Sequence, residues 1–307
     1  MTAKRPSLMV VGSVAYDDIR TAELSGERLL GGSASHFSFA AALAGAHPRV
    51  VAVVGEDFDR SDIELLAAIP ADLGGLAIRP GKSFRWGGAY NEDFSERVTL
   101  FTELGVFEDF QPELPESFKN EGVIFLANIH PALQGRVLDA ARSPRLVALD
   151  TMNLWIDLNR AELEAVLPRV DLFFVNEEEA RMLSGETNLV LAGEKILEMG
   201  PRACCLKKGE HGVLLFVDGQ ILPLPGFPVR ELVDPTGAGD CFAGGVMGCL
   251  AASGSLDAKG LREACLAGSV LGSMAVEGLG VTGLKGRSHE EFRDRLAAFK
   301  RLLGISG

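Results

Sequence analysis

Short runs of apolar residues recur along this chain, and stretches with helical character separate them. Runs that are apolar at every position predict strands buried on both faces, as in a parallel sheet. We expect such strands at 8–12, 50–55, 123–127, 145–149, 171–175 and 203–207. Helices are expected at 34–44, 62–69, 132–142, 161–167, 177–184, 190–199, 238–252, 258–277 and 288–303. This alternation predicts an α/β fold in which helices cover both faces of a mostly parallel sheet.

Two segments depart from this alternation. Residues 83–90 and 97–101 flank a polar turn, which predicts a β-hairpin outside the alternating core. A second hairpin is expected where Asp218-Gly219 separates two apolar runs, because this dipeptide favours a type I′ turn. No internal repeat or Pro/Gly-rich linker interrupts the 307 residues, so we expect a single domain.

The loop 233–240 (Val-Asp-Pro-Thr-Gly-Ala-Gly-Asp) leads into an apolar helix of small residues. Its two glycines let the backbone approach a bulky group, and the helix N-terminus adds partial positive charge, which together predict a phosphate site. A carboxylate beside a phosphate is unfavourable unless it accepts a proton from the attacking group, and this predicts a catalytic role for Asp240. In the structural alternative, Asp234 or Thr236 caps the helix and the glycines only form a turn.

The loop 234–240 resembles the C-terminal signature of the PfkB/ribokinase superfamily of sugar and nucleoside kinases, with Pro235 in place of a threonine. The resemblance covers nearly the whole chain. It implies a three-layer ribokinase-like core with a small β lid, built as a single kinase domain over 1–307. By position, the lid is expected to come from about 15–31 and 82–106.

The same resemblance implies roles for the signature residues. The backbone amides of Gly237, Ala238 and Gly239 are expected to form an anion hole for the transferred phosphoryl group. Asp240 is expected to be the catalytic base that deprotonates the acceptor hydroxyl.

Asn176 and Glu179 follow a predicted strand and open a helix. In the structural alternative, Asn176 is an N-cap and Glu179 closes a capping box. The pair also resembles the second signature of the superfamily, which implies that both residues order Mg²⁺ through water near the phosphates. A metal ion in that place neutralises charge on the acid and on the phosphate.

The acceptor side is expected near the end of the first strand. Asp17 lies just past that strand, and its carboxylate can accept hydrogen bonds from two hydroxyl groups; the alternative is a solvated turn acid. Gly31 and Gly32 resemble the N-terminal signature, a hinge whose backbone touches the sugar. His36 replaces the asparagine usual in that signature, so it is expected either to bind hydroxyls or to pack on its helix.

The donor side is expected after the strand 203–207. Lys207, Lys208 and Gly209 stand where the superfamily has its nucleotide loop, and we expect them, with Thr236, to bind the nucleotide. The two lysines would supply local positive charge in an acidic protein; the alternative is a solvated turn.

The charge composition limits the classes of partner that the protein is expected to bind. The 42 acidic residues outnumber the 30 basic ones and leave a net charge of −12. Nucleic acids and anionic membranes attract basic surfaces, so we expect neither as a partner. No apolar run is long enough to span a bilayer, and the first residues do not resemble a signal peptide, so we expect a cytoplasmic protein.

The sequence therefore predicts an ATP-dependent kinase that phosphorylates a hydroxymethyl group of a small sugar, with Mg²⁺ and a monovalent cation as candidate cofactors. One alternative is a nucleoside acceptor, such as adenosine or cytidine, on whose base aromatic side chains would stack. The candidates for this stacking are Phe37, Phe39, Trp86 and Phe107.

Another alternative is a regulator that binds sugar or nucleotide without turnover. The aromatic face of the lid hairpin also predicts a homodimer through the lid.

Overall fold

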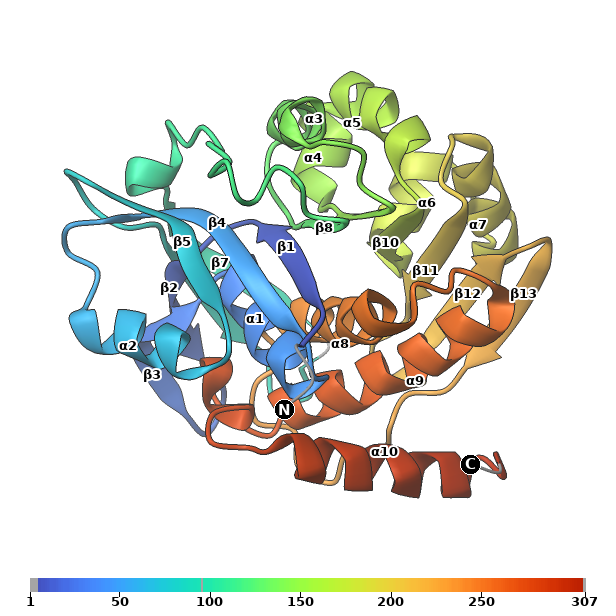
Figure 1. Cartoon of the computed structure of the whole chain (residues 1–307). Helices are drawn as coiled ribbons and strands as arrows, with labels where there is room; N and C mark the ends of the chain where they lie inside the picture. Colours follow the sequence, from blue (N-terminus) through green and yellow to red (C-terminus); the bar gives the residue numbers. More distant parts are fainter. Residues whose placement is uncertain (1–4, 95, 306–307) are drawn as a thin grey trace.

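The computed structural model describes residues 5–94 and 96–305 and contains two β-sheets (Figure 1). The strands of the large sheet are β1 (Ser7–Val11), β4 (His47–Gly55), β5 (Asp72–Arg79), β8 (Val123–Leu126), β9 (Leu146–Asp150), β10 (Leu172–Asn176), β11 (Ala203–Lys207), β12 (Val213–Val217) and β13 (Gln220–Leu224). Their order is β13-β12-β11-β10-β9-β8-β1-β4-β5. Neighbours from β11 to β5 are parallel, whereas β12 and β13 are antiparallel additions at one edge. The mostly parallel α/β sheet expected from the sequence is confirmed.

Helices cover both faces of the large sheet (Figure 1). One layer contains α1 (Ser33–Leu43), α2 (Arg60–Ala68), α8 (Ala238–Ser253), α9 (Ala258–Ala275) and α10 (His289–Leu302). The other contains α3 (Pro131–Ala140), α4 (Asn153–Leu158), α5 (Arg160–Val166), α6 (Glu177–Ser184) and α7 (Leu189–Glu198). Short 3₁₀ turns lie at Gly105–Phe107, Leu167–Arg169, Gly209–His211 and Gly280–Gly283. Across the described ranges, none of these helices combines the length and apolarity needed to cross a membrane.

The core explains why the strands are apolar at every position. Successive residues of one strand enter different layers, so that Phe173 packs among α3–α7 and Phe174 packs among α1, α8 and α9. Both side chains are fully buried. Burial on two faces is the expected environment of a parallel strand with helices above and below it.

Strand β5 was not predicted from the sequence. Its segment contains Gly74 and Gly75, and adjacent glycines are unfavourable in strands because they add no side-chain packing. In the structure β5 pairs with β4, where a β-carbon on Gly75 would lie 2.6 Å from the carbonyl oxygen of Val50. The close approach of the two backbones explains the glycine, and it depends on tertiary contacts.

The hairpin formed by β12 and β13 is confirmed. Asp218 and Gly219 have φ angles of 50° and 70°, and a type I′ turn requires positive φ at both central residues.

The second sheet, called here the small sheet, has the order β3-β2-β6-β7. Its strands are β2 (Ala15–Arg20), β3 (Ser25–Gly31), β6 (Arg85–Tyr90) and β7 (Arg97–Glu103). Two stretches far apart in the sequence therefore meet in one sheet, with β2 and β6 as parallel neighbours. The predicted hairpin of residues 83–101 forms β6 and β7.

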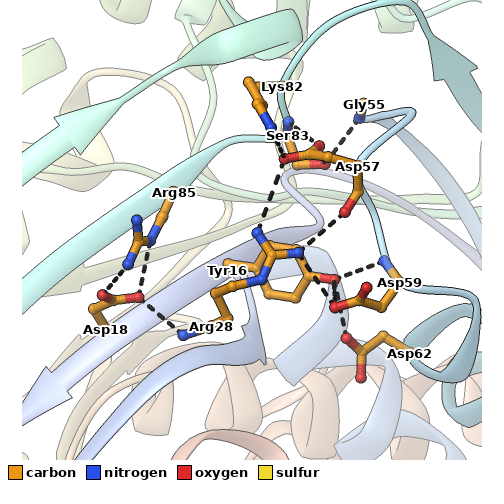
Figure 2. Close-up of polar contacts among 10 residues, drawn as sticks. All are labelled: Tyr16, Asp18, Arg28, Gly55, Asp57, Asp59, Asp62, Lys82, Ser83 and Arg85. Atoms are coloured by element: carbon orange, nitrogen blue, oxygen red, sulfur yellow. Dashed lines mark hydrogen bonds and ion pairs between the residues drawn. The ribbon is translucent and has the colours of Figure 1, made fainter.

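A polar network joins the small sheet to the loop after β4 (Figure 2). The backbone amide and hydroxyl of Ser83 donate to Asp57 Oδ1 at 2.7 and 2.8 Å, and Ser83 Oγ accepts from the amide of Gly55 at 2.9 Å. Arg28, from β3, donates to the Asp57 carbonyl and to Asp59 Oδ2 at 3.0 and 3.2 Å. The network also includes Tyr16, Asp18, Asp62, Lys82 and Arg85. The base of the small sheet is thus attached to the core at a defined place.

Candidate active site

Three neighbouring strands of the large sheet each have a polar residue at the last position. Asp150 is the last residue of β9, Asn176 of β10 and Lys207 of β11. Asn176 and Lys207 are direct partners in the β10–β11 register. The carboxyl ends of parallel strands form the usual ligand edge of an open α/β sheet. The candidate site begins at this edge.

Lys207 and Asp150 form a close ion pair. Nζ of Lys207 lies 3.0 Å from Oδ1 and 2.8 Å from Oδ2 of Asp150. The lysine side chain is 18% exposed and the aspartate is buried. Burial lowers the pKa of Lys207, but the charges of Asp150 and Glu179 outweigh burial and raise this pKa above its usual range. The lysine is therefore charged at neutral pH.

Asn176 and Glu179 form the reciprocal contacts of a capping box at the start of α6. The amide of Glu179 donates to Asn176 Oδ1 at 2.9 Å, and the amide of Asn176 donates to Glu179 Oε2 at 2.7 Å. Burial raises the pKa of Glu179 to about 7, with Lys207 opposing the rise and Asp150 adding to it. The structural alternative is thus realised, and the same contacts fix both side chains beside Asp150 and Lys207.

The loop before α8 is held by Asp234. Its Oδ1 accepts from the amide of Thr236 at 2.8 Å, and its Oδ2 accepts from the amide of Gly280 at 2.9 Å. Asp234 is buried, so both bonds are shielded from water. The side chain does not cap α8, whose N-cap is Gly237. Asp234 instead ties the loop to the turn after α9.

Gly237 and Gly239 are glycines for different structural reasons. Gly237 has a φ of 72°, which favours glycine, and a β-carbon there would lie 2.4 Å from the ring of His36. A β-carbon on Gly239 would lie 3.5 Å from Nζ of Lys207. The amide of Ala238 bonds the carbonyl of Pro235 at 3.2 Å. Because a helix start leaves its first amides without intrahelical acceptors, Gly239 can offer a donor to an anion beside Lys207.

Asp240 lies in the first turn of α8 and keeps partial contact with solvent. Loss of water around the carboxylate raises its pKa to about 6, and the charges of Asp150 and Asp17 also act on it. His36 and Lys207 oppose this rise. Residues from the N-terminal part and the middle of the chain therefore interact electrostatically with Asp240.

His36 and Asp17 form a buried pair on the other side of the loop. Nε2 of His36 lies 3.7 Å from Oδ2 of Asp17, and the two residues are 2% and 6% exposed. Nε2 is among the buried polar atoms of the described residues that have no hydrogen-bond partner. Burial lowers the pKa of His36, but the contacts with Asp17 and Cys241 outweigh burial and raise it well above its usual range. A polar ligand at this place would satisfy the nitrogen.

Gly31 lies directly against Asp17, and Gly32 lies against the backbone of Ser13. A β-carbon on Gly31 would lie 2.0 Å from Asp17 Oδ2. Gly32 has a φ of 87°, and a β-carbon there would lie 2.5 Å from the carbonyl oxygen of Ser13. The two glycines therefore let β3 turn into α1 without displacing Asp17.

The other candidates on the donor side lie farther out. Lys208 is half-buried, and its amide donates to the carbonyl of Gly212 at 2.8 Å. Gly209 is exposed in the turn that follows. Thr236 contacts the small sheet, because its hydroxyl lies 2.9 Å from the hydroxyl of Tyr90. Only Lys207 among the proposed nucleotide residues lies within the buried cluster.

The aromatic candidates for base stacking have partners within the protein. Phe37 stacks on Phe125 in the core at 4.3 Å between ring centroids. Phe107 stacks on Phe84 and Phe110, and Phe39 is buried. Arg97 lies 5.3 Å above the ring of Trp86. These contacts favour packing roles for all four side chains.

Sequence reasoning did not select Asp150 or Tyr90. Asp150 is the last residue of a buried strand, and Asp17 was selected because it follows one, so an acid at a strand end was an available signal for Asp150 as well. In the structure Asp17 lies within β2. Tyr90 has no comparable signal, because its contact with Thr236 joins residues 146 positions apart.

We compared the chain with known proteins. The model of the pfkB family carbohydrate kinases matches residues 108–285. A cytidine kinase from Thermococcus kodakarensis is 31% identical over 78% of this chain and 87% of its own length. A nucleoside kinase from Methanothermobacter thermautotrophicus is 25% identical over 78% and 81%. An inositol 3-kinase from Oryza sativa is 28% identical over 89% and 69%.

Solved structures share the fold. The nucleoside kinase of Burkholderia thailandensis in complex with inosine has a TM-score of 0.77 at 19% identity, over 97% of this chain and 98% of its own. An Escherichia coli protein that holds ATP and Mg²⁺ has a TM-score of 0.78 at 18% identity, over 95% and 99%. The large sheet, its helical layers and the small sheet are thus those of a ribokinase-like fold.

Proposed function

Because the chain belongs to the pfkB family of carbohydrate kinases, we propose that it transfers the γ-phosphoryl group of ATP to a hydroxymethyl group of a nucleoside. The observation that carries this proposal is the position of Asp240. It lies in the first turn of α8, directly after Gly237, which approaches the ring of His36, and Gly239, which approaches Nζ of Lys207. The charges of Asp150, His36, Lys207 and Asp17 all act on its carboxylate. A phosphate donor and a hydroxyl acceptor would meet at this carboxylate.

In the proposed reaction, Asp240 accepts the proton of the acceptor hydroxyl. The freed oxygen forms a bond to the γ-phosphorus while the bond from that phosphorus to the β–γ bridging oxygen breaks, and ADP leaves. The amides of Gly237, Ala238 and Gly239 would donate to the transferred group, with Ala238 giving up its bond to Pro235. Positioned charge stabilisation of this kind is often the largest catalytic contribution, so the glycines matter as much as the acid.

The chemistry of the donor set fits Mg²⁺. The carboxylate of Asp150 pairs with Lys207, and the charges of Glu179 and Asp240 also act on this lysine. Burial raises the pKa of Glu179 to about 7 and that of Asp240 to about 6. Excess buried negative charge of this kind favours a bound cation. Asn176 and Glu179 would hold the ion through water, and Asp150 is a further candidate. When bound, the ion would neutralise charge on the phosphates.

We place the acceptor hydroxyls at Asp17, His36, Gly31 and Gly32. The buried carboxylate and the unpartnered Nε2 of His36 supply one acceptor and one donor. A pair of this kind suits neighbouring hydroxyl groups, which both a ribose and a free sugar carry. The names of the cytidine kinase and nucleoside kinase relatives favour a nucleoside over the simple sugar expected from sequence.

We place the donor nucleotide over Lys207, Lys208, Gly209 and Thr236, at the end of β11. We also assign the chain to one domain, with the small sheet and its connections at 15–31 and 82–106 as the lid. The contact of Tyr90 with Thr236 supports this assignment, because it joins the small sheet to the signature loop.

A coupled assay of ADP release with Mg²⁺ and ATP tests the function. The acceptors are cytidine, adenosine and inosine, with ribose, fructose and myo-inositol as the competing class. We expect nucleosides to give the highest kcat/KM. A clear preference for fructose or inositol would move the acceptor to a sugar or polyol. ATP binding without release of ADP for any acceptor would favour a regulator.

A further inference from the structure

Lys207 is the one proposed nucleotide residue that is buried in the acid cluster. Its backbone pairs with Asn176 in the sheet, its ammonium group binds Asp150, and Glu179 and Asp240 act on its charge. A contact with a part of the nucleotide remote from the reacting phosphate would not require any of these neighbours. These neighbours are the residues expected around the reacting phosphate, so Lys207 lies close to where phosphoryl transfer would occur.

The distance to the signature loop adds an independent observation. A β-carbon on Gly239 would lie 3.5 Å from Nζ of Lys207, so the ammonium group approaches the backbone of this residue directly. Gly239 is one of the residues whose amides are proposed to bind the transferred group. An oxygen held by those amides would therefore lie near the ammonium group.

The ion pair with Asp150 leaves the lysine able to bind a further group. An ammonium group has three N–H donors, and Asp150 offers two carboxylate oxygens, at 3.0 and 2.8 Å. The side chain is 18% exposed, so the ion pair does not enclose it completely. A purely structural counter-ion for Asp150 would not need to approach Gly239 as well.

We propose that Lys207 is a further catalytic residue, which donates a hydrogen bond to a non-bridging oxygen of the phosphoryl group during transfer. This proposal rests on the proposed kinase function. Lys207 keeps its proton throughout, and the proton of the acceptor still goes to Asp240. The contribution arises because charge spreads over the oxygens of the transferring group, where a fixed cation stabilises it.

Lys207→Met removes the charge and keeps the length of the side chain, and Lys207→Gln keeps a donor for Asp150. We expect each to lower kcat with the best nucleoside by about 10²-fold or more, with the Kd for MgATP within about threefold of the parent. Binding of MgADP with aluminium fluoride and nucleoside, which imitates the transferring group, should weaken by a factor similar to the loss in kcat. Lys259→Met, at an exposed position of α9, is the matched control and should behave as the parent.

A structural role predicts a different pattern. Affinity for MgATP, thermal stability and affinity for the aluminium fluoride complex would then fall together, and activity would follow the folded fraction. This pattern, or near-parent kcat in a folded variant, would overturn the proposal. The parent enzyme is tested first, so a parent without acceptor-dependent ADP release rejects the kinase function and the role of Lys207 with it.

A structure of the parent with MgADP, aluminium fluoride and nucleoside tests the contact even if both variants fail to fold. The expected result is Nζ of Lys207 within about 3 Å of a fluorine atom. A lysine that still contacts only Asp150, more than about 4 Å from every fluorine, would overturn the proposal.

Discussion

Burial raises the pKa of Asp240, and four residues distant in sequence also act on it. Asp17, His36, Asp150 and Lys207 all act on its carboxylate, and their charges have opposite signs. A base must be deprotonated at the working pH and still accept a proton during transfer, and a pKa of about 6 meets both needs.

Asp240→Asn should reduce kcat by about 10²-fold or more, because the substitution keeps the shape and removes the proton acceptor. Affinity for MgATP should change little, since the anion hole uses backbone amides. Steady-state kinetics and calorimetry measure the two quantities, with Asp294→Asn on the exposed face of α10 as the control. A folded, ATP-binding variant with near-parent turnover would reject Asp240 as the base.

The raised pKa of Asp240 also predicts a pH profile. The folded-state pKa lies above the usual value for Asp, so the carboxylate becomes protonated and inactive as the pH falls through about 6. We expect kcat/KM for the nucleoside to decrease about tenfold per pH unit below this value. Glu179 titrates in a neighbouring pH range, and Glu179→Gln is therefore the control. If Asp240 is the base, the profile of this variant should keep the same acidic limb. A parent profile that is flat down to pH 5 would contradict the assignment.

At the scale of elements, the small sheet has an attached base and an outer hairpin. Asp57 and Ser83 hold the base beside the end of β4, whereas most residues of β7 are exposed. Local opening needs least free energy where few apolar contacts are lost. The outer hairpin is therefore the part of the lid expected to move.

Amide hydrogen exchange in β6 and β7 should slow when nucleoside and MgATP are added, because the closed lid shields these strands from solvent. Helix α10, which contributes no residue to the proposed site, is the internal control and should exchange at the same rate in both states. Strong and equal protection of β6 and β7 with and without ligands would show that the lid is rigid.

At the scale of the whole molecule, β7 is an edge strand with exposed apolar side chains. Val98 and Leu100 are 60% and 44% exposed, and β7 has a neighbour on one side only. An unprotected apolar edge is a template for pairing with another chain. This surface supports the homodimer through the lid that the sequence suggested.

Sedimentation velocity tests the dimer. The parent should sediment as a dimer, and Leu100→Lys should shift it toward the monomer, because a charge on the edge strand opposes pairing. Leu302→Lys, at a 67% exposed position on α10, should leave the distribution unchanged. A monomeric parent, or equal effects of both substitutions, would show that β7 does not form a dimer interface.

The sequence by itself determined the layered core and the location of the signature loop. Strands buried on both faces must be apolar at every position, as in 172–175, so their pattern is readable without tertiary information. The Gly-Ala-Gly-Asp loop is readable for a similar reason, because its φ angles and helix start are local properties. The hairpin at Asp218-Gly219 belongs to the same class.

Only the tertiary structure decided which residues meet. The pairing of β5 with β4, the ion pair of Lys207 with Asp150, and the contact of His36 with Gly237 each join segments that no local pattern connects. The pKa of Asp240 depends on the same long-range contacts, since burial and neighbouring charges act through space rather than along the chain. Residue type therefore marked the candidates, and the fold determined their neighbours and their charge.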